Sequence, residues 1–180
     1  MILEKFLPSE RDSWIWKLAD LSDVTGIVTL AQRHFENEID SIFKPEPIVL
    51  ARNVTFAIVN QHYLPGTELI SVAKNGDGRI VAYTWAKRGD RACWSDDEIV
   101  SIRMAHVDLT MPVKLRIRLI NDMLDIWEGY AYAVGVPIIC SNSMRREQDA
   151  FLKLHARRGY EVRGSYAYKK LNLTQATPAN

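Results

Sequence analysis

The sequence predicts an α/β (α+β) fold in which a mixed, mostly antiparallel sheet carries helices on both faces. Segments rich in alternating or β-branched apolar residues recur along the chain, and segments with apolar residues at helical spacing lie between them. Their order is β-α-α-β-β-β-α-β-α-β with one more strand left open at the end, which gives six to seven strands and about four helices. The 180 residues are 47% hydrophobic and 25% charged, which is ordinary for one soluble domain. We expect this domain to span residues 1–171, with a polar tail at 172–180.

The first third of the chain predicts one strand and two helices. Alternating apolar residues from Trp14 to Leu18 are typical of a half-buried strand. Ser22 or Asp23 can then cap a helix, whose apolar face carries Val24, Ile27, Val28 and Ala31. A second helix follows "KPEP" and ends before "LPG", and its apolar positions are Ile48, Val49, Phe56 and Val59.

The middle of the chain predicts three strands and a long helix. The segments "ELISVAK" and "RIVAYTWAKR" flank "NGDG", whose glycines suit a hairpin turn. A third β-branched run, "EIVSIRMAHV", follows the acidic stretch "GDRACWSDD". Apolar side chains then recur at helical spacing, at Leu119, Ile120, Met123, Leu124, Trp127, Ala131 and Val134.

The last third predicts a strand, a helix and a closing strand or two. The short apolar run "GVPIICSN" suits a buried strand. The helix in "SMRREQDAFLKLHARRGYEV" is expected to stop at Gly159, because glycine is favoured just past a helix end. The segment "YEVRGSYAYKKL" is then expected to close the sheet.

Composition excludes several classes of function. A net charge of +1 gives no case for a nucleic-acid or membrane partner. Cys93 and Cys140 lie outside any CxxC pattern and are interpreted as reduced thiols of a cytoplasmic protein, with one long-range disulfide left open. No signal peptide or apolar run of membrane-spanning length is recognisable. The four histidines have no metal-ligand spacing, so no metal is predicted, and the GxSxG, P-loop and GxGxxG patterns are missing.

The stretch "IICSNSMRREQDAFLKLHARRGYEVRGSYAYKKL" resembles the GNAT superfamily of acyl-CoA-dependent N-acyltransferases. In that family the fifth strand often ends in Asn, here Asn142, and the next helix closes with an aromatic residue, a spacer, Gly and an aromatic residue, here Phe151 and Gly159-Tyr160. The order of elements fits over most of the chain, and the sequence itself fits over residues 138–171. The resemblance implies acyl transfer, with acetyl-CoA or another acyl-CoA as donor and a small-molecule or protein amine as acceptor.

The family's pyrophosphate loop departs from its usual pattern in this chain. The family has Gln or Arg, two residues, Gly, one residue, then Gly or Ala, so that backbone N–H groups approach the phosphates. Here the place is taken by residues 110–116, "TMPVKLR", which contain no glycine, and Pro112 has no N–H to donate. By position, the resemblance implies these cofactor contacts: Val107, Leu109, Lys114, Leu115, Arg116 and Asn142.

The same segment has two readings. Val113, Leu115, Ile117 and Leu119 alternate with cations, as in a strand that would align Lys114, Arg116 and Arg118. Pro112 and the later helical spacing favour instead a helix with an exposed basic face.

Candidate catalytic residues follow from the family's chemistry. Acyl transfer to an amine requires removal of a proton from the amine and a proton for the departing thiolate. The family's proton-donating Tyr falls at His155, which titrates near pH 6.5 and can donate or relay a proton. Glu98 resembles a glutamate base of some members, and His106 is expected near the cofactor carbonyl. Packing of the two histidines and solvation of the acidic cluster around Glu98 are the alternatives.

A second function stays open. A GNAT-fold protein that has lost catalysis would serve as a structural or interaction protein, as in small bacteriophage proteins with similarly altered loops. With that function the protein would be a component of a virion or of another protein assembly, and not a cytoplasmic enzyme. A homo-oligomer is compatible with either reading.

Overall fold

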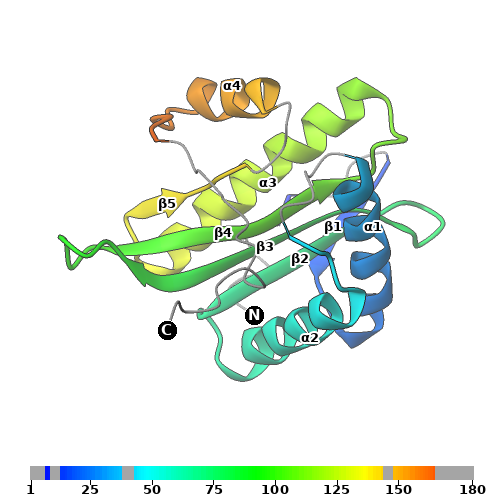
Figure 1. Ribbon diagram of the computed structural model, residues 1–180, viewed down its shortest axis with the longest axis horizontal. Coiled ribbons are helices and arrows are strands. Elements are labelled where there is room, and N and C mark those ends of the chain that lie inside the picture. The colour runs from blue at the N-terminus through cyan, green and yellow to red at the C-terminus, as the bar shows by residue number, and fades with distance from the viewer. Residues whose placement is uncertain (1–6, 9–12, 38–42, 144–147, 165–180) are drawn as a thin grey trace, which may run out of the picture.

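The computed structural model describes residues 7–8, 13–37, 43–143 and 148–164. Its elements, in chain order, are β1 Ile15–Leu18, a 3-10 turn at Leu21–Asp23, α1 Val24–Asn37, α2 Pro47–Tyr63, β2 Glu68–Lys74, β3 Ile80–Arg91, β4 Glu98–Val107, α3 Val113–Val134, β5 Ile138–Cys140 and α4 Asp149–Arg157. This order matches the predicted order as far as α4 (Figure 1).

The strands form a single sheet in the order β1-β2-β3-β4-β5. The first four pair antiparallel, and β5 is parallel to β4. The mixed, mostly antiparallel sheet is therefore confirmed, with five strands in the described residues where six to seven were predicted. Of the predicted closing strand, residues 160–164 have no regular structure, and residues 165–171 lie outside the described residues.

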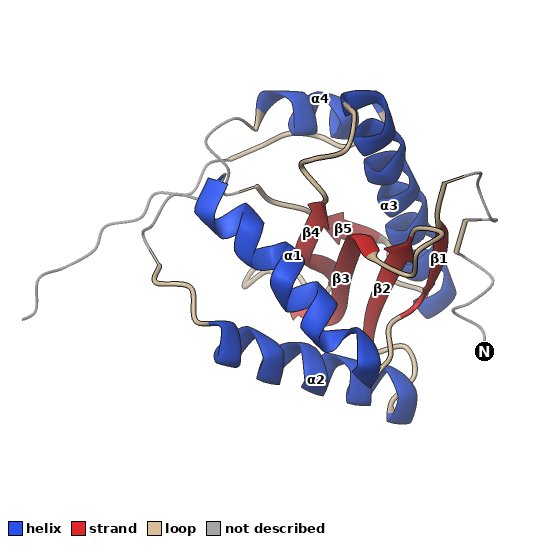
Figure 2. Cartoon of the chain, turned by 90° about the vertical axis from the view of Figure 1, so that its right-hand side faces the viewer, coloured by secondary structure: helices blue, strands red, loops and turns tan. Residues whose placement is uncertain are grey.

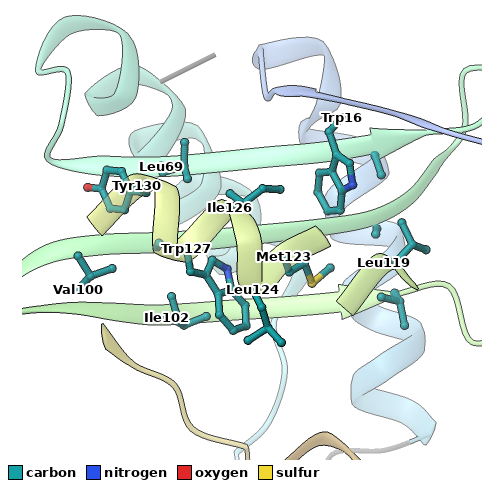
Figure 3. Close-up of a cluster of buried hydrophobic side chains, with 14 of the residues drawn as sticks. Trp16, Leu69, Val100, Ile102, Leu119, Met123, Leu124, Ile126, Trp127 and Tyr130 are labelled. Carbon is teal, nitrogen blue, oxygen red and sulfur yellow. The ribbon is translucent and has the colours of Figure 1, made fainter. Parts of the chain in front are cut away.

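The helices form two layers on opposite faces of the sheet, as predicted. Figure 2 shows α1 and α2 against one face and α3 with α4 on the other. The core between the sheet and α3 is built around Trp127, which is fully buried with Met123 and Leu124 on the same helix (Figure 3). The second core lies under α1 and α2 and includes Ile27, Ile58 and Tyr83.

The start of the α1 region differs in detail from the prediction. Ser22 and Asp23, the predicted caps, lie in the 3-10 turn that leads into α1, and the N-cap of this turn is Asp20, whose carboxylate accepts the Ser22 N–H at 2.8 Å. Asp23 completes a capping box by accepting the N–H of Asp20. The Asp23 carboxylate is buried and also pairs with Lys17 and Lys74 at 3.1 and 2.5 Å. This carboxylate therefore links the first strand, the 3-10 turn and β2.

A buried carboxylate joins the first strand to α3. The indole N–H groups of Trp14 and Trp16 both donate to Asp122 Oδ2, at 2.9 and 3.0 Å. Asp122 is 1% exposed. Because both tryptophans point into the main core, the first strand is fixed to α3 by polar as well as apolar contacts.

The apolar face of α2 was wrongly predicted. Helix α2 packs on the sheet with smaller or polar side chains, namely Val54, Ala57, Ile58 and Gln61. The four positions expected as its apolar face point outward instead, with Ile48, Val49, Phe56 and Val59 exposed by 76%, 36%, 61% and 37%. The physical reason is that α2 has apolar residues on both sides, so its pattern does not distinguish the inner side from the outer one.

None of the described helices is long and apolar enough to cross a membrane.

Candidate functional site

The site is organised by an open edge of β4. Strand β5 pairs with β4 at three positions, from Ile99 opposite Ile138 to Ser101 opposite Cys140. Strand β4 continues to Val107, whereas β5 ends at Cys140. Along residues 102–107 the described part of the chain thus leaves one edge of β4 without a partner strand. An open edge offers backbone donors and acceptors to an extended ligand.

At the end of this edge the chain turns into α3 through a loop stabilised by Asp108. The Asp108 carboxylate is buried, and it accepts both the N–H and the hydroxyl of Thr110, at 3.0 and 2.8 Å. Arg79 donates to its other oxygen at 2.6 Å. Burial alone raises the pKa of Asp108, but the contacts with Thr110 and Arg79 outweigh it and lower that pKa. Asp108 is therefore an ion-paired carboxylate that uses one of the loop's N–H groups.

The first turn of α3 keeps free donors. The N–H of Met111 bonds to the carbonyl of Asp108 at 3.1 Å, and the N–H of Leu115 bonds to Pro112 at 2.9 Å. The N–H groups of Val113 and Lys114 have no acceptor within the described residues. The first turn contains no acidic residue. This end of α3 therefore carries the positive end of the helix dipole without a compensating charge.

Three cations flank those donors. The segment is helical, so the alternative of a strand with aligned cations is excluded. Lys114, Arg116 and Arg118 form no ion pair with any described residue. The Nε of Arg116 is buried and has no hydrogen-bond partner in the described part of the protein. A buried guanidinium N–H without an acceptor is costly, and an anion held against α3 would satisfy it.

The predicted cofactor contacts fall in different environments. Val107 is buried, and its carbonyl accepts the Nε2–H of His34 at 2.5 Å. Leu115 packs against the main core, while Leu109 is partly buried. Asn142 is exposed, two residues beyond the end of β5.

His155 is surrounded by aromatic side chains on the face of the sheet that α3 and α4 cover. It is 3% exposed, and its ring contacts Phe151, Trp127 and Tyr160. Its Nδ1 donates to the carbonyl of Phe151 at 2.9 Å, so Nε2 is the acceptor of the neutral ring. The hydroxyl of Ser141 lies 3.1 Å from that Nε2. Burial lowers the pKa of His155, which keeps the ring neutral near pH 7.

Ser141 is the polar side chain that connects His155 to the open edge. It follows Cys140, the last residue paired with β4, and it is partly exposed. Sequence reasoning singled out the neighbouring Asn142 and missed Ser141. The signal was present, because a strand leaving a parallel pair commonly ends in the polar residues of a ligand site.

The last turn of α4 holds the backbone of His155 in place. The N–H of Tyr160 bonds to the carbonyl of His155 and the N–H of Gly159 to that of Ala156, both at 3.1 Å. Together with the φ of +86° at Gly159, this is a Schellman motif, so the predicted glycine stop is confirmed. The Tyr160 hydroxyl is buried without a partner in the described residues, and burial raises its pKa to about 12.

Glu98 lies at the far end of β4 and is already paired. Arg88 Nε and Nη2 donate to its two oxygens, each at 2.6 Å, and Arg88 Nη1 also reaches the carbonyl of Val134. The contact with Arg88 lowers the pKa of Glu98. Glu98 is thus a charged bridge between β3 and β4 close to the end of α3.

His106 belongs to a buried cluster on the side of α1. Its ring stacks on that of His34, and its Nδ1 is hydrogen-bonded to the hydroxyl of Tyr83 at 2.9 Å. Phe35 contacts the same ring edge-on. His34 and Tyr83 were not predicted as site residues. For His34 the signal was its position three residues after Ala31 and seven after Ile27, on the buried stripe of α1.

Sequence comparison and structural comparison give different results. No known family pattern matches the sequence, and no curated protein sequence matches it either. Solved structures do match over nearly the whole chain. A predicted acetyltransferase from Clostridium acetobutylicum, solved with acetyl-CoA, is 15% identical and superposes over 91% of this chain and 99% of its own, with a TM-score of 0.65.

Two further structures agree. Glucosamine-6-phosphate N-acetyltransferase from Arabidopsis thaliana is 12% identical and superposes over 89% of this chain and 100% of its own, with a TM-score of 0.62. An aminoglycoside antibiotic 6'-N-acetyltransferase from Acinetobacter baumannii is 13% identical, with 89% and 99% coverage and a TM-score of 0.62. At this level of identity the similarity establishes the fold.

Proposed function

Because the chain has the GNAT acetyltransferase fold, we propose that it is an acyl-CoA-dependent N-acyltransferase that transfers an acyl group, such as acetyl, to an amine. The observation that carries the proposal is the open edge of β4, which leads from Ser141 to the basic first turn of α3. An acyl-CoA is an extended chain with a pyrophosphate at one end. A strand edge that no described strand covers, and that ends at the first N–H groups of α3 and at cations, suits such a molecule.

The residues of α3 fit a pyrophosphate in spite of the missing glycines. The N–H groups of Val113 and Lys114 would hold one phosphate at the end of the helix dipole. The side chains of Lys114 and Arg116 would neutralise charge, and a phosphate oxygen would satisfy the buried Nε of Arg116. The negative charge of Asp108 does not oppose this arrangement, because Arg79 compensates it.

Ser141 and His155 supply a route for a proton. Acyl-CoA, when bound, supplies the acyl group as an activated thioester. Because Nδ1 of His155 is engaged with Phe151, Nε2 takes up the proton that the amine loses, by way of the Ser141 hydroxyl. The same two groups return that proton to the sulfur as the thioester bond breaks. Ser141 is then the group that touches the reactants, and His155 acts through it.

A second candidate function rests on Asp108. Its carboxylate accepts the N–H of Thr110, and its backbone carbonyl accepts the N–H of Met111. Two N–H groups of the loop are therefore not available to bind a phosphate. A chain that retains the fold without acyl transfer, as a structural or interaction protein, would have this loop. The two candidates differ in whether an acyl-CoA binds.

The first experiment is a thermal-shift titration with acetyl-CoA and, separately, with desulfo-CoA. A ligand at about 100 times its dissociation constant stabilises the folded state by roughly 2.7 kcal/mol, which is a shift of a few degrees for a domain of this size. We expect a saturable shift in the wild type, a much weaker one in Arg116→Met, and no change in Arg91→Met. Arg91 is a suitable control because it pairs with Glu98 in the sheet, at the opposite end of β4 from α3.

Two results separate binding from catalysis. With binding established, Ser141→Ala is expected to reduce the rate of acyl transfer to a panel of primary amines by about 100-fold, while the thermal shift with acetyl-CoA persists. No shift with either ligand would contradict the proposal and favour the second candidate.

A further inference from the structure

The outer face of α2 carries several exposed apolar side chains that the fold and the candidate site leave without an explanation. Six apolar side chains form a stripe along it, which we name the α2 stripe: Ile48, Val49, Phe56, Val59, Tyr63 and Leu64. Phe56 and Tyr63 are 61% and 80% exposed. A helix that is apolar on all sides is normally buried on all sides. In Figure 2, α2 lies at the outside of its layer, with one side towards the sheet and the other directed away.

The size of the stripe is in the range of apolar patches that mark interaction sites. Phe56 and Tyr63 alone present roughly 300 Å² if a whole aromatic side chain presents about 200 Å². The four aliphatic residues bring the stripe towards the roughly 800 Å² that each partner contributes to a stable interface. Contiguous apolar patches beyond a few hundred Å² mark interaction sites.

The order of residues in the stripe is self-complementary. Val49 and Ile48 precede Phe56 by seven and eight residues, and Tyr63 and Leu64 follow it by the same intervals. An antiparallel pair of α2 helices centred on Phe56 would therefore bring Val49 against Tyr63 and Ile48 against Leu64 of a second copy. Closed two-fold dimers require such a surface, because the same patch serves both subunits.

Charge selects the same arrangement. Arg52 is an exposed cation on the same side of α2, four residues before Phe56. Antiparallel pairing would keep the two arginines about 12 Å apart along the helix axis, beyond the screening length of about 8 Å at physiological salt. Parallel pairing would bring the two arginines together.

A hollow lies next to the stripe. An open depression of about 600 Å³ lies between the end of α2 and the turn before α1, lined by Leu21, Ile58, Val59, His62 and Tyr63 among others. In the antiparallel arrangement the opposing end of the second helix, with Ile48 at its tip, lies over this depression. Ile48 is 76% exposed.

We infer that the α2 stripe is the interface of a two-fold homodimer, formed by antiparallel α2 helices that cross at Phe56. This inference is independent of the proposed function, since it uses no residue of the candidate site. The aromatic pair at the centre would supply the anchors, and the aliphatic ends would exclude water from them.

The test is the molar mass in solution, measured by sedimentation over a wide range of concentration. We expect a reversible dimer for the wild type and a monomer for Phe56→Glu, which places two carboxylates face to face at the two-fold axis. Trp94→Glu is the matched control, because Trp94 is 85% exposed on the hairpin between β3 and β4 and loses an aromatic side chain to the same charge. This control is expected to remain dimeric.

A mixing experiment makes the assignment specific. Phe56→Glu and Phe56→Lys are each expected to be monomeric alone and to form a mixed dimer together, because opposite charges then meet at the axis. Far-UV circular dichroism and thermal unfolding confirm that each variant is folded, and Tyr63→Glu serves in place of a Phe56 variant that is not. A wild type that is monomeric at every concentration would overturn the inference, and so would a dimer that survives Phe56→Glu.

Discussion

The imidazole rings of His34 and His106 stack face to face, with 4.2 Å between the ring centroids and 9° between the ring planes. His34 comes from α1 and His106 from β4, and both are buried. The Nε2–H of His34 donates to the carbonyl of Val107, so α1 is attached to the last residue of β4. The stack therefore fixes the position of the strand end from which the loop to α3 departs.

The first prediction concerns the contribution of His34 to stability. His34→Ala removes the donor to the buried carbonyl of Val107 and leaves a cavity beside His106. We expect a loss of about 2–4 kcal/mol in the free energy of unfolding, measured by urea denaturation. Glu36→Ala, on the exposed side of the same helix, is expected to change it by less than about 0.5 kcal/mol. Equal effects of the two substitutions would contradict this role.

The second prediction concerns Gly159, which ends α4 below His155. Gly159→Ala puts a side chain on a residue with a φ of +86°, where a Cβ meets nothing within 4 Å, so the cost is confined to the backbone. We expect a loss of about 1–2 kcal/mol. Gly76→Ala is the control, because its added Cβ also meets nothing within 4 Å and its φ is not in the positive range. A loss that is no larger in Gly159→Ala than in the control would refute the assigned strain.

The order of elements could be predicted because most of them have one clear period. The helix whose spacing is clear from Leu119 begins at Val113, as the alternative with Pro112 at its start predicted, because Pro112 with extended backbone sets its first turn. The orientation of α2 could not be predicted, because Ala57 and Ile58 are no more apolar than Phe56 and Val59. Packing against the sheet decides which side of α2 is buried, and the sequence of α2 alone does not contain that information.

The candidate site could be predicted only where it is local in sequence. The stop at Gly159 depends on neighbouring residues, and it was found. The contact of His34 with Val107 joins residues 73 positions apart, and that of His155 with Ser141 joins α4 to the end of β5. Such contacts depend on the whole topology. No period or motif indicates them.

The third prediction separates a structural role of Glu98 from its predicted role as a base. Because Arg88 engages both carboxylate oxygens, we expect Glu98→Gln to lower the thermal midpoint and to leave acyl transfer within tenfold of the wild type. The stability loss should shrink at high salt, since charge screening weakens the pair. Asp96→Asn is the control, because Asp96 is fully exposed and lies 3.6 Å from Arg91. A fall of about 100-fold or more in the transfer rate, with unchanged stability, would restore the role of a base.

The fourth prediction uses the lowered pKa of His155. In the unfolded chain this histidine titrates near pH 6.5, and burial moves the pKa of the folded protein below that value. Between the two values the unfolded chain binds more protons, so His155 stabilises the fold fully above about pH 6.5, and this contribution is lost as the pH falls towards the folded pKa. The slope is at most about 1.4 kcal/mol per pH unit.

His155→Gln cannot titrate, so the pH dependence of its free energy of unfolding should be flatter than that of the wild type below about pH 6.5. The measurement is urea unfolding of both proteins across that range. Parallel curves for the wild type and His155→Gln would mean that the ring is as accessible to protons in the folded protein as in the unfolded chain. In that case a large fraction of the rings would be protonated below about pH 6.5 and could not accept the Ser141 proton there, so the relay would operate only above that pH.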